Sequence, residues 1–325
     1  MNLYRNVANR GEHTVELIDK ILIKGSFHFE ISTQLCQVFV QYEHEKKNFM
    51  YKAADLNDLR SRALLIMNVD EKSKSDKKEL RKEKLNKFVV LIDNAFEVQA
   101  ICLQLKQAGH FGFASYENKC GREDMVALIK ILQNQYDDWE TEIKAIRTRY
   151  NYMNFFLSNQ LYELYMFLKG NTQTDRKILA TVGAVLRFMG LSTDTLYQIP
   201  KIYQKYTTPE SGDHTKALEN IGQTLNFISK IKDFSRDQKR IAEAQNVSFV
   251  EKVQPGKPYF AWLDESSPLV IKVLLALYCN TTNTLPLAYQ VLFCHEDTSF
   301  EEIDLLIRRC EESTEISKQR ICFQL

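Results

Sequence analysis

The stretch of residues 136–168 constrains the fold more than any other part of the sequence. Its first half carries apolar and aromatic residues at spacings of three and four, which place them on one face of a helix. These residues are Tyr136, Trp139, Ile143, Ile146 and Tyr150. Aromatic residues and two asparagines interrupt the spacing over residues 151–156, and a second helical pattern follows. Its apolar positions are Leu157, Leu161, Leu164, Tyr165 and Leu168. We therefore expect two buried helices joined by an aromatic elbow, a packing joint without reactive groups.

The composition also favours a mainly α-helical fold. The chain has 325 residues, of which 44% are hydrophobic and 26% charged, an ordinary globular balance. Only 11 glycines and 6 prolines favour long helices over a many-turned β-sandwich. The formal net charge of +1 creates no global field that would attract nucleic acid or an anionic membrane. Any partner is therefore expected to bind through a local surface rather than through the net charge of the chain.

The cysteines indicate a reducing compartment. Seven cysteines occur without C-x-x-C spacing, and no secretory hydrophobic region lies near the start of the chain. We expect a cytoplasmic protein. No run of about 18 apolar residues is seen, so we expect no membrane span.

Residues 1–68 are predicted to form a small β element with helices. Residues 13–24 have helical spacing and are followed by Gly25 as a stop signal. Residues 55–67 have a second helical pattern, with Asp55 as the candidate N-cap. Between them, apolar residues alternate with polar ones as in half-buried strands. The alternating residues are Phe27, Phe29, Ile31, Val38, Val40, Tyr42, Phe49 and Tyr51.

Residues 69–87 are predicted to be a charged linker. Residues 70–87 contain eight basic and five acidic residues, with Leu80 and Leu85 as the apolar exceptions. An exposed loop and helix start is favoured over a small basic docking patch. The run has no interleaved aromatic residues on which single-stranded nucleic acid would stack, so we expect no nucleic-acid binding.

Residues 88–206 are predicted to form the helical core. An apolar helix is expected over residues 88–109, ending at Gly109, and further helices over residues 125–146, 175–189 and 193–206. Pro200 should kink or restart the last of these. The aromatic residues of the loop after Gly109 are interpreted as packing anchors rather than as the rim of a ligand pocket. They are Phe111, Phe113 and Tyr116.

The remaining chain is predicted to form a polar helix and linker, residues 207–258, and a C-terminal strand-loop-helix unit, residues 259–325. In that unit we expect a helix over residues 269–278, a buried strand over residues 287–294 and a helix over residues 300–310. Thr298 and Glu301 have the spacing of a capping box. The loop of residues 295–299, at the end of the strand, is where a ligand would most naturally bind.

The motifs of common catalytic and cofactor sites are absent from the sequence. Neither G-x-x-x-x-G-K-[ST] nor G-x-G-x-x-G occurs, so we place no ATP in this chain. Cys279, Cys294, His295 and Cys310 are interpreted as scattered packing residues rather than zinc ligands. Acidic neighbours such as Glu301 and Glu302 are interpreted as helix-start charges or solvated residues. The sequence thus predicts no catalytic, cofactor-binding or metal-binding residues.

One set of residues resembles the pattern W…R…YxxLNYxTxxQL: Trp139, Ile143, Arg147, Tyr150, Tyr152, Asn154, Phe155, Phe156, Gln160 and Leu161. This pattern is a signature of the mysterin family of giant E3 ubiquitin ligases, which join an AAA+ ATPase core to a RING-bearing ligase module, and the chain therefore resembles that family. In the same order along the chain, the resemblance extends to residues 55–65, Gly109-His110, residues 290–294, Thr298, Glu301-Glu302 and Arg308-Arg309-Cys310. It implies an elongated, stalk-like helical region just upstream of the ATPase ring.

The resemblance implies a non-catalytic scaffold segment of an E3 ubiquitin ligase that acts in protein ubiquitination. ATP, magnesium and zinc would then belong to other segments of the ligase, and the chain would be a fragment or a truncated relative. Its partners would be the ATPase and ligase segments and the ubiquitination substrates. Two alternatives remain open: a freestanding helical adaptor that binds a protein partner, and an enzyme with a degenerate nucleotide site in the C-terminal unit.

Overall fold

The computed structural model describes residues 2–32, 36–70, 76–169, 176–191, 198–207, 214–231, 271–272, 274–276, 286–311 and 323–324. The chain divides into two compact units, Met1–Thr141 and Glu142–Leu325. The division falls within helix α4 (Met125–Arg149), inside the segment that the sequence predicts as one helical core. The described chain is mainly α-helical, as predicted.

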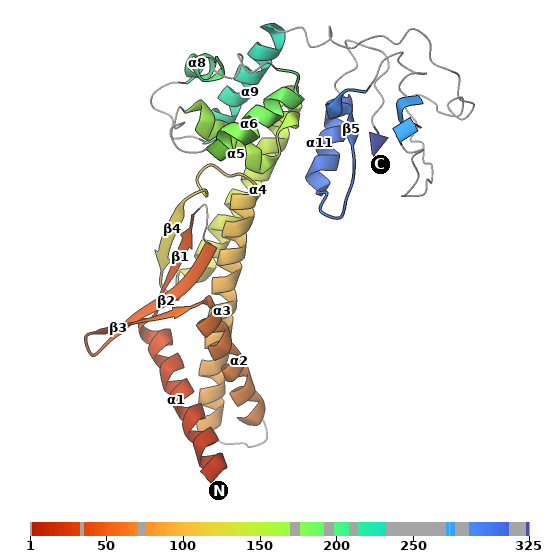
Figure 1. The fold of residues 1–325 in the computed structure, drawn as a ribbon. Helices are drawn as coiled ribbons and strands as arrows, with labels where there is room; N and C mark the ends of the chain where they lie inside the picture. The colour runs from red at the N-terminus through yellow and green to blue at the C-terminus, as the bar shows by residue number, and fades with distance from the viewer. Residues whose placement is uncertain are drawn as a thin grey trace. The chain divides into compact units, whose positions relative to one another are not determined.

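Unit 1 combines helices with an antiparallel sheet (Figure 1). Its helices are α1 (Asn2–Lys24), α2 (Ala53–Asp70), α3 (Asp76–Gln107) and the first part of α4. Its strands are β1 (Ser26–Ile31), β2 (Cys36–His44), β3 (Lys47–Lys52) and β4 (Tyr116–Cys120). The helices α1, α2 and α3 pack against one another and contact β2.

The sheet has the strand order β3-β2-β1-β4 and is antiparallel throughout. At its centre, Phe29 of β1 lies opposite Val38 of β2 and Asn118 of β4. The period-two pattern correctly predicted β1, β2 and β3, since their alternate apolar residues face the core. Strand β4 was missed. Tyr116 was expected to lie in a loop, but it begins this edge strand, whose mostly polar residues do not alternate clearly with apolar ones.

The core of unit 1 lies between the sheet and the helices. Its largest fully buried side chains are Phe27, Phe29, Phe88, Ile18, Ile21, Leu56, Leu85, Ile92, Leu105 and Met125. Phe111 and Phe113 are also buried, which agrees with the prediction that they are packing anchors. Residues Lys78–Gln107 of α3 are long and apolar enough, by length and composition, to cross a membrane. Half of the most apolar window of this helix is buried inside unit 1, so its length is weak evidence for a membrane span.

Several boundaries in unit 1 differ from the predicted ones. Helix α1 begins at Asn2, well before residue 13, and it ends before Gly25. A Cβ at Gly25 would lie 2.3 Å from the carbonyl oxygen of Ile21, so this position requires glycine. Asp55 is not the N-cap of α2. It lies in the first turn, where its Oδ2 accepts a hydrogen bond from the backbone N–H of Lys52 at 3.0 Å.

Helix α3 already begins within the segment that was predicted to be a charged linker. Residues 76–87 form its first turns, and Leu85 is fully buried. The two arginines of α2 contact acidic residues, as expected for exposed cations. Arg60 pairs with Asp93 of α3 at 2.5 Å, and Arg62 pairs with Asp58 at 2.7 Å.

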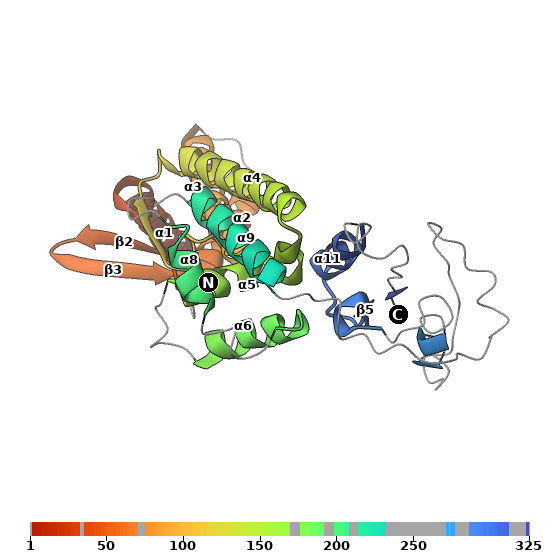
Figure 2. The same ribbon diagram turned by 90° about the horizontal axis from the view of Figure 1, so that it is seen from above.

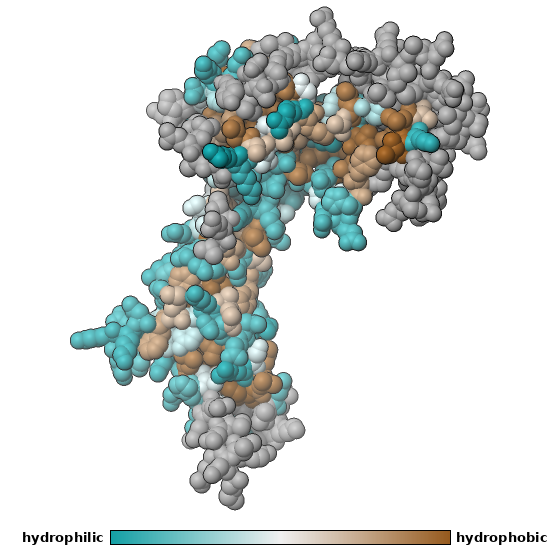
Figure 3. Space-filling view, viewed as in Figure 1, coloured by the Kyte–Doolittle hydropathy of each residue, from teal (hydrophilic) through white to brown (hydrophobic). Residues whose placement is uncertain are grey.

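The β2–β3 hairpin turns through two residues with positive φ, Glu45 at 50° and Lys46 at 60°. Positive φ at both central positions is typical of a type I′ turn, which matches the twist of paired strands. The tip of this hairpin is hydrophilic, as the teal protrusion of Figure 3 shows. Solvation of the tip is consistent with its charged sequence.

Unit 2 contains the second part of α4 and a set of short helices (Figures 1 and 2). Its elements are η1 (Asn151–Phe155), α5 (Ser158–Leu168), α6 (Arg176–Phe188), α8 (Ile199–Gln204), α9 (His214–Ile231), η4 (Ala288–Gln290), β5 (Val291–Leu292), α11 (Phe300–Glu311) and β6 (Phe323–Gln324). The short 3₁₀ helix η1 is the predicted elbow between α4 and α5. The predicted helix over residues 175–189 is confirmed as α6, and the helix expected in the segment of residues 207–258 is α9. Pro200 lies in the first turn of α8, so it starts a helix rather than kinking one.

The predicted buried strand over residues 287–294 is wrong in length and burial. Its first residues form η4, only Val291 and Leu292 form strand β5, and Phe293 is 58% exposed. Strand β5 pairs in parallel with β6, which lies more than thirty positions further along the chain. The strand, loop and helix nevertheless follow one another as predicted. The linker of residues 208–213, the polar segment of residues 232–258 and half of the predicted helix 269–278 lie outside the described residues, while residues 271–272 and 274–276 of that helix are helical.

Candidate functional site

The most distinctive polar cluster of the described chain lies where the elbow meets α11. Helix α4 presents Arg147 two residues before its end, and the side chain of this arginine is nearly completely buried, at 6% exposure. Arg147 follows Ile143 by four positions, which places it beside the buried stripe of α4. A buried arginine requires compensating partners, because removing its charge from water is costly.

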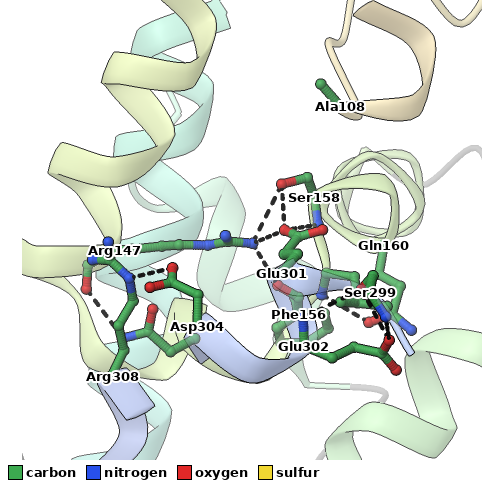
Figure 4. Close-up of polar contacts among 12 residues, drawn as sticks. Ala108, Arg147, Phe156, Ser158, Gln160, Ser299, Glu301, Glu302, Asp304 and Arg308 are labelled. Carbon is green, nitrogen blue, oxygen red and sulfur yellow. Dashed lines mark hydrogen bonds and ion pairs between the residues drawn. The ribbon is translucent and has the colours of Figure 1, made fainter. Parts of the chain in front are cut away.

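Glu301, in the first turn of α11, supplies that compensation (Figure 4). The Nη2 group of Arg147 donates to Glu301 Oε1 at 2.8 Å and to the carbonyl oxygen of Phe156 at 2.8 Å. The same Glu301 oxygen accepts from the backbone N–H of Ser158 at 2.8 Å and from its hydroxyl at 2.6 Å. Glu301 therefore neutralises the arginine and also caps the N-terminus of α5.

Burial lowers the pKa of Arg147, and the charge of Glu301 opposes that shift. The Nε of Arg147 is buried without a hydrogen-bond partner. The pair is therefore a desolvated ion pair whose strength depends on both partners remaining in place. Such a pair can fix the packing of three elements, but it offers no free base or nucleophile.

A second arginine, Arg309 of α11, also contacts the elbow. Arg309 Nη1 donates to the carbonyl oxygen of Asn154 at 2.7 Å. Its guanidinium carbon lies 5.6 Å from the ring centroid of Phe155 and 5.9 Å from that of Phe188. The side chain of Asn154 is itself buried and donates to the carbonyl oxygen of Arg147 at 3.3 Å. The last turn of α11 is thus bound to η1, whereas its first turn is bound through Glu301 to α4 and α5.

The N-terminal cap of α11 is Ser299, not Thr298. The backbone N–H of Ser299 donates to Glu302 Oε2 at 2.7 Å, and the N–H of Glu302 donates back to Ser299 Oγ at 3.3 Å. This reciprocal pair is a capping box one residue later than predicted. Thr298 Oγ1 instead accepts from the N–H of His295 at 2.8 Å and closes the preceding loop. Glu301, which was predicted to complete the box or to be solvated, is the partner of Arg147.

Helix α9 is fixed to the start of the elbow through Tyr150 and Glu219. The hydroxyl of Tyr150 donates to Glu219 Oε1, and Arg149 Nη1 donates to Glu219 Oε2 at 2.7 Å. The ring of Tyr150 lies directly over Gly222, where a Cβ would be only 2.3 Å from Cδ2 of the ring. The elbow therefore contacts α9 as well as α11.

Two of the four residues considered as possible metal ligands, Cys294 and His295, have described side chains. Within the described ranges, no group of three or more His, Cys, Asp or Glu side chains is arranged to hold a metal ion. In the loop of residues 295–299, His295 Nδ1 accepts from the N–H of Asp297 at 3.2 Å, a local turn contact. Cys279 lies outside the described residues, and the side chain of Cys310 is not described.

Comparison with known proteins gives two findings. Residues 265–324 match the family model described as the RNF213 AAA domain. Over 369 aligned residues the chain is 20% identical to the E3 ubiquitin-protein ligase rnf213-beta of Danio rerio. The relationship to mysterin, RNF213, is confirmed. The alignment covers 92% of this chain and 7% of the zebrafish ligase, so the chain corresponds to a small part of that relative.

The RNF213 match coincides with the segment that supplies α11. Residues that carried the resemblance in two distant segments meet at the elbow, with Arg147 and Asn154 on one side and Glu301 and Arg309 on the other. Both segments resemble the same family in sequence, but their sequences predicted no contact between them. One local signal was available, since Arg147 is a charged residue beside the apolar stripe of α4. A cation at such a position needs a partner.

Proposed function

We propose that this chain is a non-catalytic scaffold segment of an RNF213-like E3 ubiquitin ligase with AAA+ ATPase activity, acting in protein ubiquitination in the cytoplasm. The supporting observation is the buried pair of Arg147 and Glu301. It fixes α11, which belongs to the segment that matches the RNF213 AAA domain, to the elbow of a helical unit. In this proposal the elbow holds the AAA-like segment in a defined orientation within unit 2.

The chemistry of the described residues favours this mechanical role. Arg147 and Glu301 satisfy each other, Ser299 and Glu302 form a cap, and Thr298 closes a turn. Each of these groups has a packing or capping task. The sequence also lacks a P-loop motif, so ATP and magnesium would bind to other segments of the ligase, as would the zinc of a RING.

The first test is to sequence the transcript beyond codon 325. The 325-residue chain and any longer protein that the transcript encodes are then assayed for activity. A reading frame that continues into a P-loop motif and a RING supports the proposal. The encoded longer protein should then hydrolyse ATP and form ubiquitin conjugates, and the 325-residue chain alone should do neither. A stop codon directly after Leu325, with a protein partner retained in pull-downs of the chain alone, would favour the adaptor instead.

A second test addresses a degenerate nucleotide site in the C-terminal unit. Any ligand that binds the folded state alone raises the melting temperature. The absence of an ATP-dependent shift of the melting temperature of this chain at millimolar ATP and magnesium, relative to a control of equal ionic strength, would remove this alternative. A saturable shift accompanied by ATP hydrolysis would contradict the non-catalytic assignment.

A further inference from the structure

Arg309 differs from the other arginines around the elbow because none of the carboxylates in the described part of the chain pairs with it. Among the described residues of this cluster, Arg147 pairs with Glu301, and Arg308 pairs with Asp304 at 2.7 Å. Glu302 is used by the Ser299 cap. Three guanidinium groups are therefore balanced by two paired carboxylates, and the excess positive charge is that of Arg309.

The surroundings of Arg309 are largely desolvated. Its Nε is buried without a hydrogen-bond partner, and one backbone carbonyl, that of Asn154, accepts from Nη1. The rings of Phe155 and Phe188 pack edge to face, with centroids 6.2 Å apart, and both lie within about 6 Å of the guanidinium carbon, a distance at which aromatic rings stabilise a cation. Tyr289 packs edge-on against Phe155 at 5.3 Å and completes an aromatic cluster.

The guanidinium keeps its charge at neutral pH. Burial and the neighbouring charge of Arg147 lower the pKa of Arg309 to about 10, which still leaves the group protonated at pH 7. Its planar fork of N–H donors has one accepting partner among the described residues, the Asn154 carbonyl. A protonated, partly desolvated fork of this kind matches the paired oxygens of an oxyanion, above all those of phosphate.

We propose that Arg309, together with the aromatic cluster of Phe155, Phe188 and Tyr289, binds a phosphate-bearing anion. The side chain is partly accessible, and Phe188 is 36% exposed, so an anion can approach from solvent beside this ring. Arg309 donates to the phosphate oxygens, and the anion supplies the negative charge that balances this guanidinium. This inference goes beyond the scaffold role and does not depend on it.

The experiment titrates inorganic phosphate into the 325-residue chain at pH 7, with sodium chloride adjusted to keep the ionic strength constant. Binding is measured by calorimetry and by broadening of the ³¹P resonance. We expect saturable binding that Arg309→Met weakens about tenfold or more, the equivalent of one charge-assisted hydrogen bond. The control is Arg149→Met, which removes an exposed arginine of the same unit and should leave phosphate binding unchanged.

Arg309→Lys guards against a folding defect in Arg309→Met, because it keeps the charge and removes the planar fork. Circular dichroism checks that each variant is folded. Weakened phosphate binding by a folded Arg309→Lys variant supports the proposal, and undiminished binding overturns it. If sodium chloride alone gave the wild-type chain the same calorimetric and ³¹P changes as phosphate, the proposal would also be overturned, since general charge screening would then explain these changes.

A nucleoside monophosphate distinguishes two sources of the phosphate group. If AMP binds several-fold more tightly than inorganic phosphate, and Phe188→Ala removes that advantage, the aromatic cluster stacks a base. Equal affinity for both ligands identifies a site for the free anion. Both outcomes support the shared phosphate chemistry, whereas the absence of binding of either ligand refutes it.

Discussion

Arg147 and Glu301 form a 2.8 Å ion pair across 154 positions of the sequence, and the same Glu301 oxygen caps helix α5 through Ser158. One carboxylate thus joins the end of α4, the start of α5 and the start of α11. The arrangement makes the packing of the AAA-like segment depend on a single side chain. It also explains why an acidic residue of the helix start is not simply solvated.

Glu301→Gln should destabilise unit 2 by about 3 kcal/mol, because it leaves the charge of Arg147 buried without a counter-ion. The value lies at the lower end for buried pairs, since the Glu301 side chain is 32% exposed. Urea denaturation, followed by circular dichroism, measures the loss. The matched control is Glu302→Gln, which weakens only the Ser299 capping box and should cost about 0.5 kcal/mol. Equal losses in the two variants would contradict the role of the ion pair.

Ser299→Ala should destabilise α11 by about 1 kcal/mol, the usual cost of losing an N-cap hydroxyl. Thr298→Ala should cost less than about 0.5 kcal/mol, because the hydroxyl of Thr298 accepts an exposed turn hydrogen bond from the N–H of His295. Hydrogen exchange of the Glu302 amide provides a local readout, since Ser299 Oγ accepts from that N–H. Faster exchange in Thr298→Ala than in Ser299→Ala would restore Thr298 as the cap.

The capping box illustrates a limit of prediction from sequence. Thr298 with Glu301 and Ser299 with Glu302 have the same spacing, so local chemistry alone allows both. The choice is made by Arg147, which engages Glu301 and leaves Glu302 for the cap. A contact across 154 positions leaves no local pattern in the sequence.

Features set by local periodicity were predictable. The helices on either side of the elbow and the three alternating strands follow from spacings of two, three and four. The helix end at Gly109 follows from a glycine in a left-handed conformation. Strand β4 was not predictable, because its pairing with β1 depends on the backbone rather than on an apolar pattern. The position of Arg309 beside Phe155 and Phe188 likewise depends on tertiary packing.

Gly222→Ala should destabilise unit 2 by about 1–3 kcal/mol, the typical cost of overpacking. The new Cβ would lie 2.3 Å from Cδ2 and 2.6 Å from Cγ of Tyr150, and Cγ is too close to the backbone to swing away. This cost outweighs the gain of about 1 kcal/mol that alanine normally brings to a helix. Thermal denaturation measures the change.

Two controls separate crowding from helix propensity. Gly11→Ala in α1 places its Cβ at an ordinary 3.8 Å from Arg81 and should not destabilise unit 1. In a Tyr150→Ala background, Gly222→Ala should become neutral or stabilising, because the obstructing ring is absent. Persistence of the full loss in that background would show that Tyr150 is not the obstruction.

Trp139→Ala should destabilise unit 1 by about 3–5 kcal/mol, as truncation of a buried tryptophan does. The indole is 4% exposed, its Nε1 donates to the carbonyl oxygen of Ala108 at 2.8 Å, and its ring packs on His110 and Phe111. Trp139→Phe keeps an aromatic ring but loses the hydrogen bond, so its loss should be smaller, about 1–2 kcal/mol. Denaturant melts give both values. A loss below about 1 kcal/mol for the alanine variant would mean that Trp139 does not anchor the loop after α3, since the loop would then retain its packing without the indole.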